Sequence, residues 1–276
     1  MFTAVVMEES GRRGLWGRMA DRVRPALPRE EEQPLPGEGE GFRLIHCPMV
    51  PGQRHWSRLA RQAGDAREEL VVDPQIPLPE GEGLGRFWPR EFPLLLAANT
   101  AVQSVEAAGV ELSRRRIGLI DRDGRYQWLA KRLVREFAEV RVACPHPQRY
   151  EETARELMEE HGAAVPVTGE EGLAGCLLVL DPERAPSRLP ADGELLRLAP
   201  FQTGDQVVNA LRCTAPAGYG RVIPMGLETT YFLGAAYELG GRKELGQCAA
   251  ARCRIGGRET STQELAARLR RRDSWL

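Results

Sequence analysis

Short apolar runs alternate with amphipathic stretches between residues 116 and 211 of the chain. Residues 117–120, 139–145, 163–169 and 176–182 have the composition of buried strands, and strand-like pieces follow at 194–200 and 206–216. Two intervening helices show apolar faces with a period of about 3.6 residues: Tyr126, Leu129, Ala130, Leu133, Val134 and Phe137, then Tyr150, Ala154, Leu157 and Met158. This alternation predicts an α/β fold, a Rossmann-like doubly wound parallel sheet with right-handed crossovers.

A second, smaller α/β domain is predicted over residues 1–91. Residues 2–7, 42–50 and 69–78 have strand patterns, and residues 54–64 form a short helix that ends on a glycine. The stretch 25–41 is rich in Pro, Glu and Gly and predicts an exposed loop. A connecting helix from Phe92 opens the Rossmann-like domain, residues 92–225. Residues 226–276 predict C-terminal helices that pack back on the N-terminal domain, and the last begins with a capping box of Ser261 and Glu264.

Composition places the chain among ordinary globular proteins, with 42% hydrophobic and 28% charged residues and a net charge of −1. That balance predicts no attraction to nucleic acid or to a membrane surface. The six cysteines are scattered and contain no C-x-x-C pair, so we expect reduced thiols in a cytoplasmic protein. The pairs His46–Cys47 and Cys144–His146 each end a strand and suggest a zinc site, but the commoner reading of such residues is buried thiols and loop histidines without metal.

The turn after residues 117–120 reads Asp-Arg-Asp-Gly-Arg, residues 121–125. At this position a dinucleotide site needs glycines that let backbone approach a pyrophosphate at a helix N-terminus. Asp121 and Asp123 occupy the first two glycine positions and repel phosphate, leaving Gly124, Arg125 and the later Arg149 as the residues that suit NAD(P). We prefer a turn in which both aspartates cap the helix around Gly124 without a ligand.

The same turn resembles, over about eight residues, the first motif of haloacid dehalogenase-type phosphatases. The resemblance implies Asp121 as nucleophile and magnesium ligand and Asp123 as general acid/base. Arg125 departs from that family's pattern. The family also needs a later lysine and acidic pair, whereas the lysines of this chain are Lys131 and Lys243.

The order of elements resembles shikimate dehydrogenase and related two-domain dehydrogenases over roughly residues 70 to 245. The stretches that carry it are "ANTAVQSVEAAGVELSRRRIGLID", "HPQRYEETARELMEEHG" and "GLETTYFLGAAYEL". The resemblance implies a small substrate domain, a Rossmann domain and a returning C-terminal helix. Asn99 and Thr100 match the family, but Ala101 stands where its catalytic aspartate lies, and the catalytic lysine and the glycine loop are missing.

These features predict a degenerate, non-redox protein that binds a small molecule or a partner in a cleft between the domains, without a required cofactor. Glu80 and Arg86, in the glycine-rich stretch before the connecting helix, and Asn99 and Thr100 are the candidate substrate-binding residues. An NAD(P)-dependent oxidoreductase with a nonstandard loop and a magnesium phosphatase remain the alternatives. A homo-oligomer is compatible with each of the three.

Overall fold

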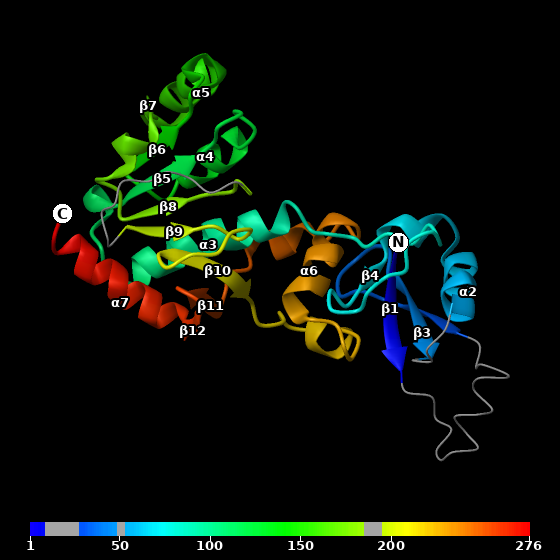
Figure 1. The fold of residues 1–276 in the computed structure, drawn as a ribbon. Helices are drawn as coiled ribbons and strands as arrows, with labels where there is room; N and C mark the ends of the chain where they lie inside the picture. The colour runs from blue at the N-terminus through cyan, green and yellow to red at the C-terminus, as the bar shows by residue number, and fades with distance from the viewer. Residues whose placement is uncertain (9–27, 49–52, 185–194) are drawn as a thin grey trace. The chain divides into compact units, whose positions relative to one another are not determined.

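The computed structural model describes residues 1–8, 28–48, 53–184 and 195–276 (Figure 1). The chain divides into two compact units. The first comprises Met1–Phe92 and Ala215–Gly246, and the second comprises Pro93–Thr214 and Gln247–Leu276. This division differs from the expected boundaries, because residues 215–246 group with the N-terminal part while the last helix belongs to the second unit.

The first unit contains a four-stranded sheet in the order β2-β3-β1-β4. β1 (Phe2–Glu8) pairs in parallel with β3 (Phe42–Pro48) and with the short β4 (Val71–Val72). β2 (Arg29–Gln33) pairs with β3 in the antiparallel direction. The expectation of an exposed loop over 25–41 was therefore wrong for β2, since backbone pairing to β3 overrides the weak strand propensity of its charged sequence. β4 is shorter than the expected strand 69–78 because Pro74 and Pro77 follow it.

Apolar residues cover both faces of this sheet. On one face Val5, Ile45 and Cys47 pack with Leu59 of helix α2 (Gln53–Ala63). Residues of the opposite parity point the other way, and there Phe2 and Phe42 stack at 5.4 Å between ring centroids. Phe232 of helix α6 (Thr229–Glu238) contacts both rings edge-on, at 5.9 and 5.1 Å. The 3-10 turns η1 (Gly64–Glu69), η5 (Tyr219–Arg221) and η6 (Lys243–Gln247) connect these elements.

The second unit contains an eight-stranded sheet in the order β12-β11-β10-β9-β8-β5-β6-β7. Its strands are β5 (Arg116–Ile120), β6 (Glu139–Ala143), β7 (Val167–Thr168), β8 (Leu178–Leu180), β9 (Leu196–Leu198), β10 (Val207–Arg212), β11 (Arg252–Ile255) and β12 (Arg258–Ser261). All pairings from β7 across to β10 are parallel. In chain order these strands lie as 3-2-1-4-5-6, the order of a Rossmann sheet, so the predicted fold class is confirmed. The antiparallel β11 and β12 extend the sheet and were not expected.

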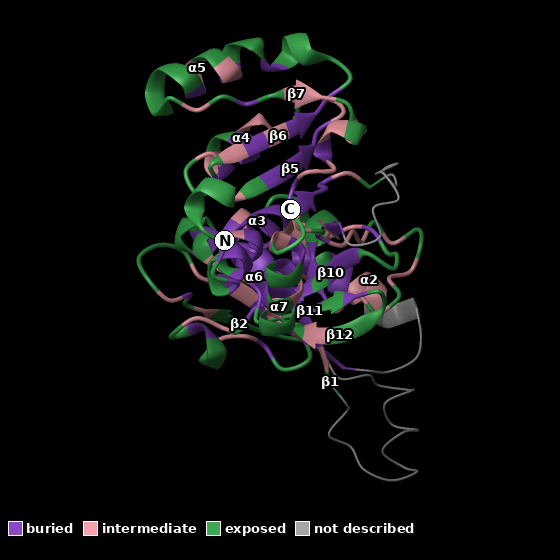
Figure 2. Cartoon of the chain, turned by 90° about the vertical axis from the view of Figure 1, so that its left-hand side faces the viewer, coloured by how far each residue is buried: buried purple, intermediate pink, exposed green. Residues whose placement is uncertain are grey.

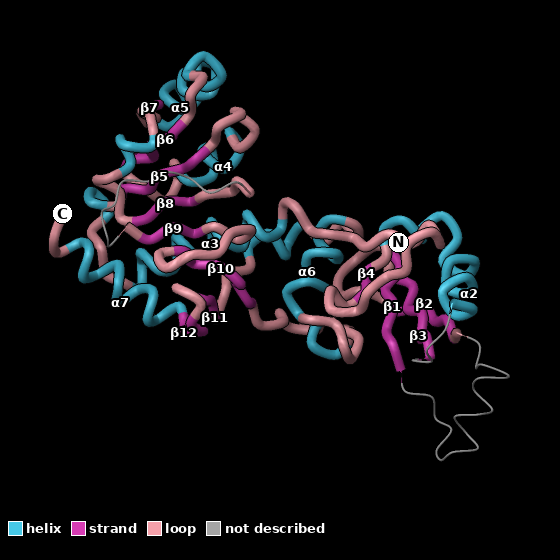
Figure 3. The backbone as a smooth tube through the Cα atoms, viewed as in Figure 1, coloured by secondary structure: helices cyan, strands magenta, loops and turns pink. Residues whose placement is uncertain are grey.

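The strands at the middle of this sheet are buried, as Figure 2 shows for β5 and β6. The helices of the unit, visible with the strands in Figure 3, are α3 (Phe92–Ala107), α4 (Gln127–Leu133), α5 (Glu151–His161) and α7 (Thr262–Asp273). Shorter turns are η2 (Leu112–Arg114), η3 (Pro147–Tyr150) and η4 (Glu170–Leu173). On α5, Met158 is 51% exposed although the helical period placed it inward, and Thr153 is buried instead. The sheet ends at the two-residue strand β7, so it is too narrow there to cover a full face of α5.

Helix α7 begins with the expected cap, because the Ser261 hydroxyl accepts a hydrogen bond from the Glu264 amide at 3.3 Å. Its C-terminal arginines do more than face solvent. Arg270 donates to the Ala108 carbonyl at 2.9 Å, and the buried Arg272 donates to the Cys176 carbonyl at 2.8 Å. These bonds fix α7 to the second unit. Across the part of the chain that is described, no helix combines the length and the apolar character that crossing a membrane requires.

Candidate functional site

The Asp-Arg-Asp-Gly turn leaves the carboxyl end of β5, between β8 on one side and β6 on the other. This is the point at which strand order reverses and where open α/β sheets bind ligands. Asp121 continues the sheet by one bond, because its amide donates to the Ala143 carbonyl at 3.0 Å. The turn therefore stands where a dinucleotide-binding loop stands in related folds.

Asp121 is fully buried, and both oxygens of its carboxylate accept hydrogen bonds. Oδ1 accepts a hydrogen bond from the Arg125 amide at 2.8 Å. Oδ2 accepts from the Tyr126 amide at 2.8 Å and from the Tyr150 hydroxyl at 2.5 Å. The carboxylate thus holds the Arg125 and Tyr126 amides, which belong to the turn before α4, and among the described residues no side chain caps the first turn of that helix.

Gly124 and Arg149 close the outer side of this turn. Gly124 has φ +68°, and a Cβ atom there would lie 2.9 Å from Cδ of Arg149. A guanidinium nitrogen of Arg149 donates to the Asp123 carbonyl, and Gln127 donates to the Arg149 carbonyl at 2.5 Å. The Asp123 carboxylate forms an ion pair with Arg125. The structure therefore brings the five sequence-predicted cofactor residues together, with their polar groups bonded to one another.

A further carboxylate, which the sequence analysis did not single out, lies beside the turn. Glu183 Oε1 accepts from the Arg122 amide at 3.3 Å, and the Arg122 side chain binds Glu170 at 3.0 Å. Burial, with the charges of Asp123 and Asp121 as smaller contributions, raises the pKa of Glu183 above its usual range. Glu183 therefore adds a third carboxylate beside Asp121 and Asp123, in a turn that also contains Arg122, Arg125 and Arg149.

Asn99 and Thr100, the predicted substrate residues on α3, serve the packing of the second unit. The Asn99 amide nitrogen donates to the Cys248 carbonyl at 2.7 Å, and its oxygen accepts from Arg132. The Thr100 hydroxyl donates to the Leu96 carbonyl at 2.6 Å and accepts from the Ala250 amide at 2.9 Å. Both side chains are buried, so these bonds explain both residues without a substrate.

Glu80 and Arg86, the other predicted substrate residues, lie in the first unit. Glu80 is exposed on a turn. Arg86 donates to the Ile76 carbonyl and lies 5.5 Å from the ring centroid of Trp88, a cation–π contact. Arg86 therefore organises its own loop.

The thiols give no sign of a metal site. All six cysteines are free, and every one except Cys248 is buried. Burial raises the pKa of Cys47 to about 11, and the Cys144 thiol donates to the His146 carbonyl at 3.4 Å. Within the described residues, no cluster of three or more His, Cys, Asp or Glu side chains has the geometry to hold a metal ion.

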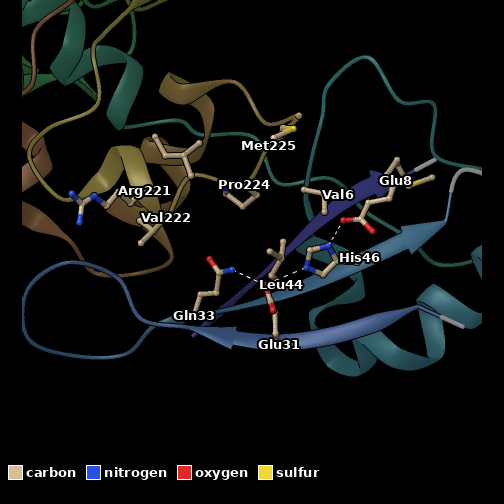
Figure 4. Close-up of a pocket in the computed structure, with 13 residues that line it drawn as sticks. Val6, Glu8, Glu31, Gln33, Leu44, His46, Arg221, Val222, Pro224 and Met225 are labelled. Carbon is tan, nitrogen blue, oxygen red and sulfur yellow. Dashed lines mark hydrogen bonds and ion pairs between the residues drawn. The ribbon is translucent and has the colours of Figure 1, made fainter. Parts of the chain in front are cut away.

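A pocket of about 600 Å³ lies in the first unit, over the carboxyl-terminal halves of β1 and β3 (Figure 4). Its lining residues come from β1, β2, β3 and the segment before α6: Val6, Met7, Glu8, Glu31, Gln33, Leu44, His46, Arg221, Val222, Ile223, Pro224, Met225 and Gly226. We refer to it as the sheet pocket. The sequence signalled only its histidine, because the lining comes from segments far apart in the chain.

His46 joins the three strands at this pocket. Its Nδ1 lies 2.6 Å from Glu8 Oε1 on β1, and its Nε2 lies 3.2 Å from Glu31 Oε1 on β2. Burial lowers the pKa of His46, but the two carboxylates outweigh burial and the net pKa is raised. Hydrogen bonds from His46 and Gln33 lower the pKa of Glu31, so this carboxyl group is ionised at neutral pH.

The raised pKa of His46 makes the stability of the first unit depend on pH. The contribution is fully present below the usual histidine pKa of about 6.5 and is lost as the pH rises through the raised value. We expect the free energy of unfolding to decrease by less than about 1 kcal/mol over this range, because the ion pairs of His46 with Glu8 and Glu31 are partly solvated. Urea midpoints measured across this pH range should show it in the wild type and in the control His161→Gln, but not in His46→Gln. An unchanged pH profile in His46→Gln would exclude this origin.

No protein-family model and no curated protein sequence matches the chain. Among solved structures it is similar to L-tryptophan dehydrogenase from Nostoc punctiforme, with 10% identity and a TM-score of 0.34, over 99% of this chain and 88% of that one. It is similar to shikimate 5-dehydrogenase from Listeria monocytogenes, with 8% identity and a TM-score of 0.31, over 100% of this chain and 91% of that one. It is also similar to quinate dehydrogenase from Corynebacterium glutamicum, with 12% identity and a TM-score of 0.31, over 100% of this chain and 94% of that one. The resemblance is weak and architectural, as the sequence predicted, and carries no statement about ligands.

Proposed function

We propose that this chain is a degenerate Rossmann-like protein that binds a small molecule and catalyses no hydride transfer. The observation that carries the non-redox part is the buried carboxylate of Asp121, which already accepts the Arg125 and Tyr126 amide hydrogens. A pyrophosphate needs such amides free, and needs space that the carboxylate fills. An internal anion thus takes the role that the cofactor has in a dinucleotide-binding turn.

The NAD(P)-dependent alternative finds little support in the positive charges near the turn. Arg125 forms its ion pair with Asp123, and Arg149 is bonded to the Asp123 backbone while packing on Gly124. These contacts occupy one nitrogen of each guanidinium group. The nearby Asp121, Asp123 and Glu183 carboxylates add repulsion.

The phosphatase alternative also conflicts with the geometry of Asp121. A nucleophilic carboxylate needs one oxygen free to attack phosphorus and another to hold magnesium. Both oxygens of Asp121 accept hydrogen bonds inside the turn, and the side chain has no exposed surface. Asp121 is therefore suited to hold the turn closed.

The sheet pocket supports the small-molecule part of the proposal. Its volume of about 600 Å³ falls within the range of ligand sites, and apolar walls with a few polar groups are typical of them. A cytoplasmic location belongs to the same proposal, and the six free thiols support it.

Calorimetric titration of the wild type with NADPH tests the non-redox assignment. We expect no saturable heat up to about 1 mM cofactor, a concentration at which most dinucleotide sites are occupied. Arg149→Ala should behave in the same way. Saturable binding by the wild type that Arg149→Ala weakens would show that the turn holds a cofactor and would overturn the assignment.

A further inference from the structure

The sheet pocket has an apolar wall on each side. Val6 and Leu44 come from the sheet, and Val222, Pro224 and Met225 come from the segment that leads to α6 (Figure 4). Met225 is 96% exposed, which is unusual for a side chain of its size and leaves it available to an incoming apolar group. The body of a small apolar molecule fits between these walls.

The polar end of the pocket offers hydrogen-bond acceptors. Both ring nitrogens of His46 face carboxylates, so the single N–H of the neutral ring, or both N–H groups of the protonated ring, point at Glu8 or Glu31. The Gln33 amide nitrogen donates to Glu31 Oε1 at 2.6 Å. Within the described residues, the bonds of both glutamates run through Oε1, which leaves Oε2 of each as an acceptor. The His46 and Gln33 donors at this end are therefore already bonded, while carboxylate oxygens of Glu8 and Glu31 can still accept a hydrogen bond from a ligand.

The charges at this end favour a cation. The two glutamates carry a summed charge of −2 when ionised, and Arg29, the register partner of His46 on β2, offsets one unit. The sum is therefore −1 while His46 is neutral, and a protonated His46 cancels it. Arg221, the permanently charged cation of the lining, extends away from the His46 end (Figure 4). An anion placed near His46 would meet both carboxylates, whereas an ammonium group would donate to them.

We propose that the sheet pocket binds a small organic ammonium compound, with its apolar body between Leu44 and the segment 222–225 and its ammonium group between Glu8 and Glu31. This inference rests on the proposed small-molecule function and names the ligand class of that site. The ammonium group and the proton on His46 compete for the same carboxylates. Binding therefore weakens as the pH falls and His46 becomes protonated.

The charged groups around His46 are those of the elements packed against it. Glu8 lies on β1 and Glu31 on β2. Arg29 is the β2 residue in register with His46, and Arg221 lies in the segment that forms the opposite wall. Among the groups around it, His46 is the one whose charge we expect to set the pH dependence.

Three probes share a cyclohexyl ring and differ in their polar group, so they separate the effect of charge from that of shape: cyclohexylmethylamine, cyclohexylmethanol and cyclohexanecarboxylate. Their affinities for the full chain are measured by NMR titration at pH 8 and at pH 6, where the amine stays charged. We expect the amine to bind about tenfold more tightly than the alcohol at pH 8, with no saturable binding of the carboxylate. The preference for the amine should shrink several-fold at pH 6.

Glu31→Gln is the decisive variant. Residue 31 lies on the exposed edge strand β2, and glutamine has nearly the same size as glutamate, so the substitution removes the charge without disturbing the fold. It should weaken amine binding about fivefold and leave alcohol binding unchanged. Glu32→Gln is the matched control: it makes the same charge change one residue further along β2, on the other face, and does not line the pocket. Its amine affinity should equal that of the wild type.

The outcomes separate the ligand class from the proposed function. Equal binding of amine and alcohol, or preferential binding of the carboxylate, would overturn the ammonium assignment and leave the pocket as a small-molecule site. Equal losses in Glu31→Gln and Glu32→Gln would overturn it too, since the effect would then be general electrostatics. If no probe binds, both the assignment and the use of this pocket fail, whereas the NADPH titration still decides the non-redox assignment independently.

Discussion

Asp121→Ala is expected to lower the free energy of unfolding of the second unit by about 3–5 kcal/mol. The substitution removes the acceptor of three hydrogen bonds, from the Arg125 and Tyr126 amides and the Tyr150 hydroxyl. The Tyr150 side chain is buried, so its hydroxyl would be left without this partner away from solvent. Asp121→Asn should cost less, about 1–2 kcal/mol, because the amide oxygen still accepts from the backbone.

Hydrogen exchange with mass spectrometry measures this loss locally, on peptides that contain β5 and β6. Asp123→Ala is the matched control, because the Asp123 side chain is 46% exposed and pairs with a more exposed Arg125. We expect its cost to stay below about 0.5 kcal/mol. Similar losses at the two aspartates would contradict the assignment of Asp121 as the residue that holds the turn.

Phe232→Ala is expected to cost about 3–5 kcal/mol in the stability of the first unit. Phe232 is fully buried and contacts the rings of Phe2 and Phe42, so its truncation leaves a cavity between α6 and the sheet. Denaturant unfolding followed by exchange in β1 and β3 peptides measures the loss.

Phe232→Leu separates cavity formation from a general effect of changing α6. Leucine fills most of the space, so we expect a loss below about 1.5 kcal/mol. A loss in Phe232→Ala that exchange reports only in β5 and β6 would contradict the placement of α6 in the first unit.

The arrangement of the second unit shows how far local patterns reach. The strand Arg116–Ile120, the helix after it and the capping of α7 were predictable, because apolar periodicity and short-range capping are encoded within a few residues. The edge strand Arg29–Gln33 and the hairpin β11–β12 were not, because strand pairing supplies the stabilisation that their own sequences lack. Met158 followed the helical period yet stayed exposed, since periodicity does not say how much sheet is present to cover a helix.

The candidate sites divide along the same line. The sequence by itself determined that two acidic residues stand where a dinucleotide loop needs glycines, so phosphate repulsion at this turn could be inferred from charge alone. The expectation that both aspartates cap the helix was wrong, because the N-cap of α4 is Tyr126 and has no side-chain cap bond. Only the tertiary structure decided that Asp121 is the buried acceptor inside the turn while Asp123 is at the surface, because Tyr150 comes from another strand–helix unit. The same holds for the sheet pocket: Glu8, Glu31 and His46 lie on three strands, and pairing of those strands brings their side chains together.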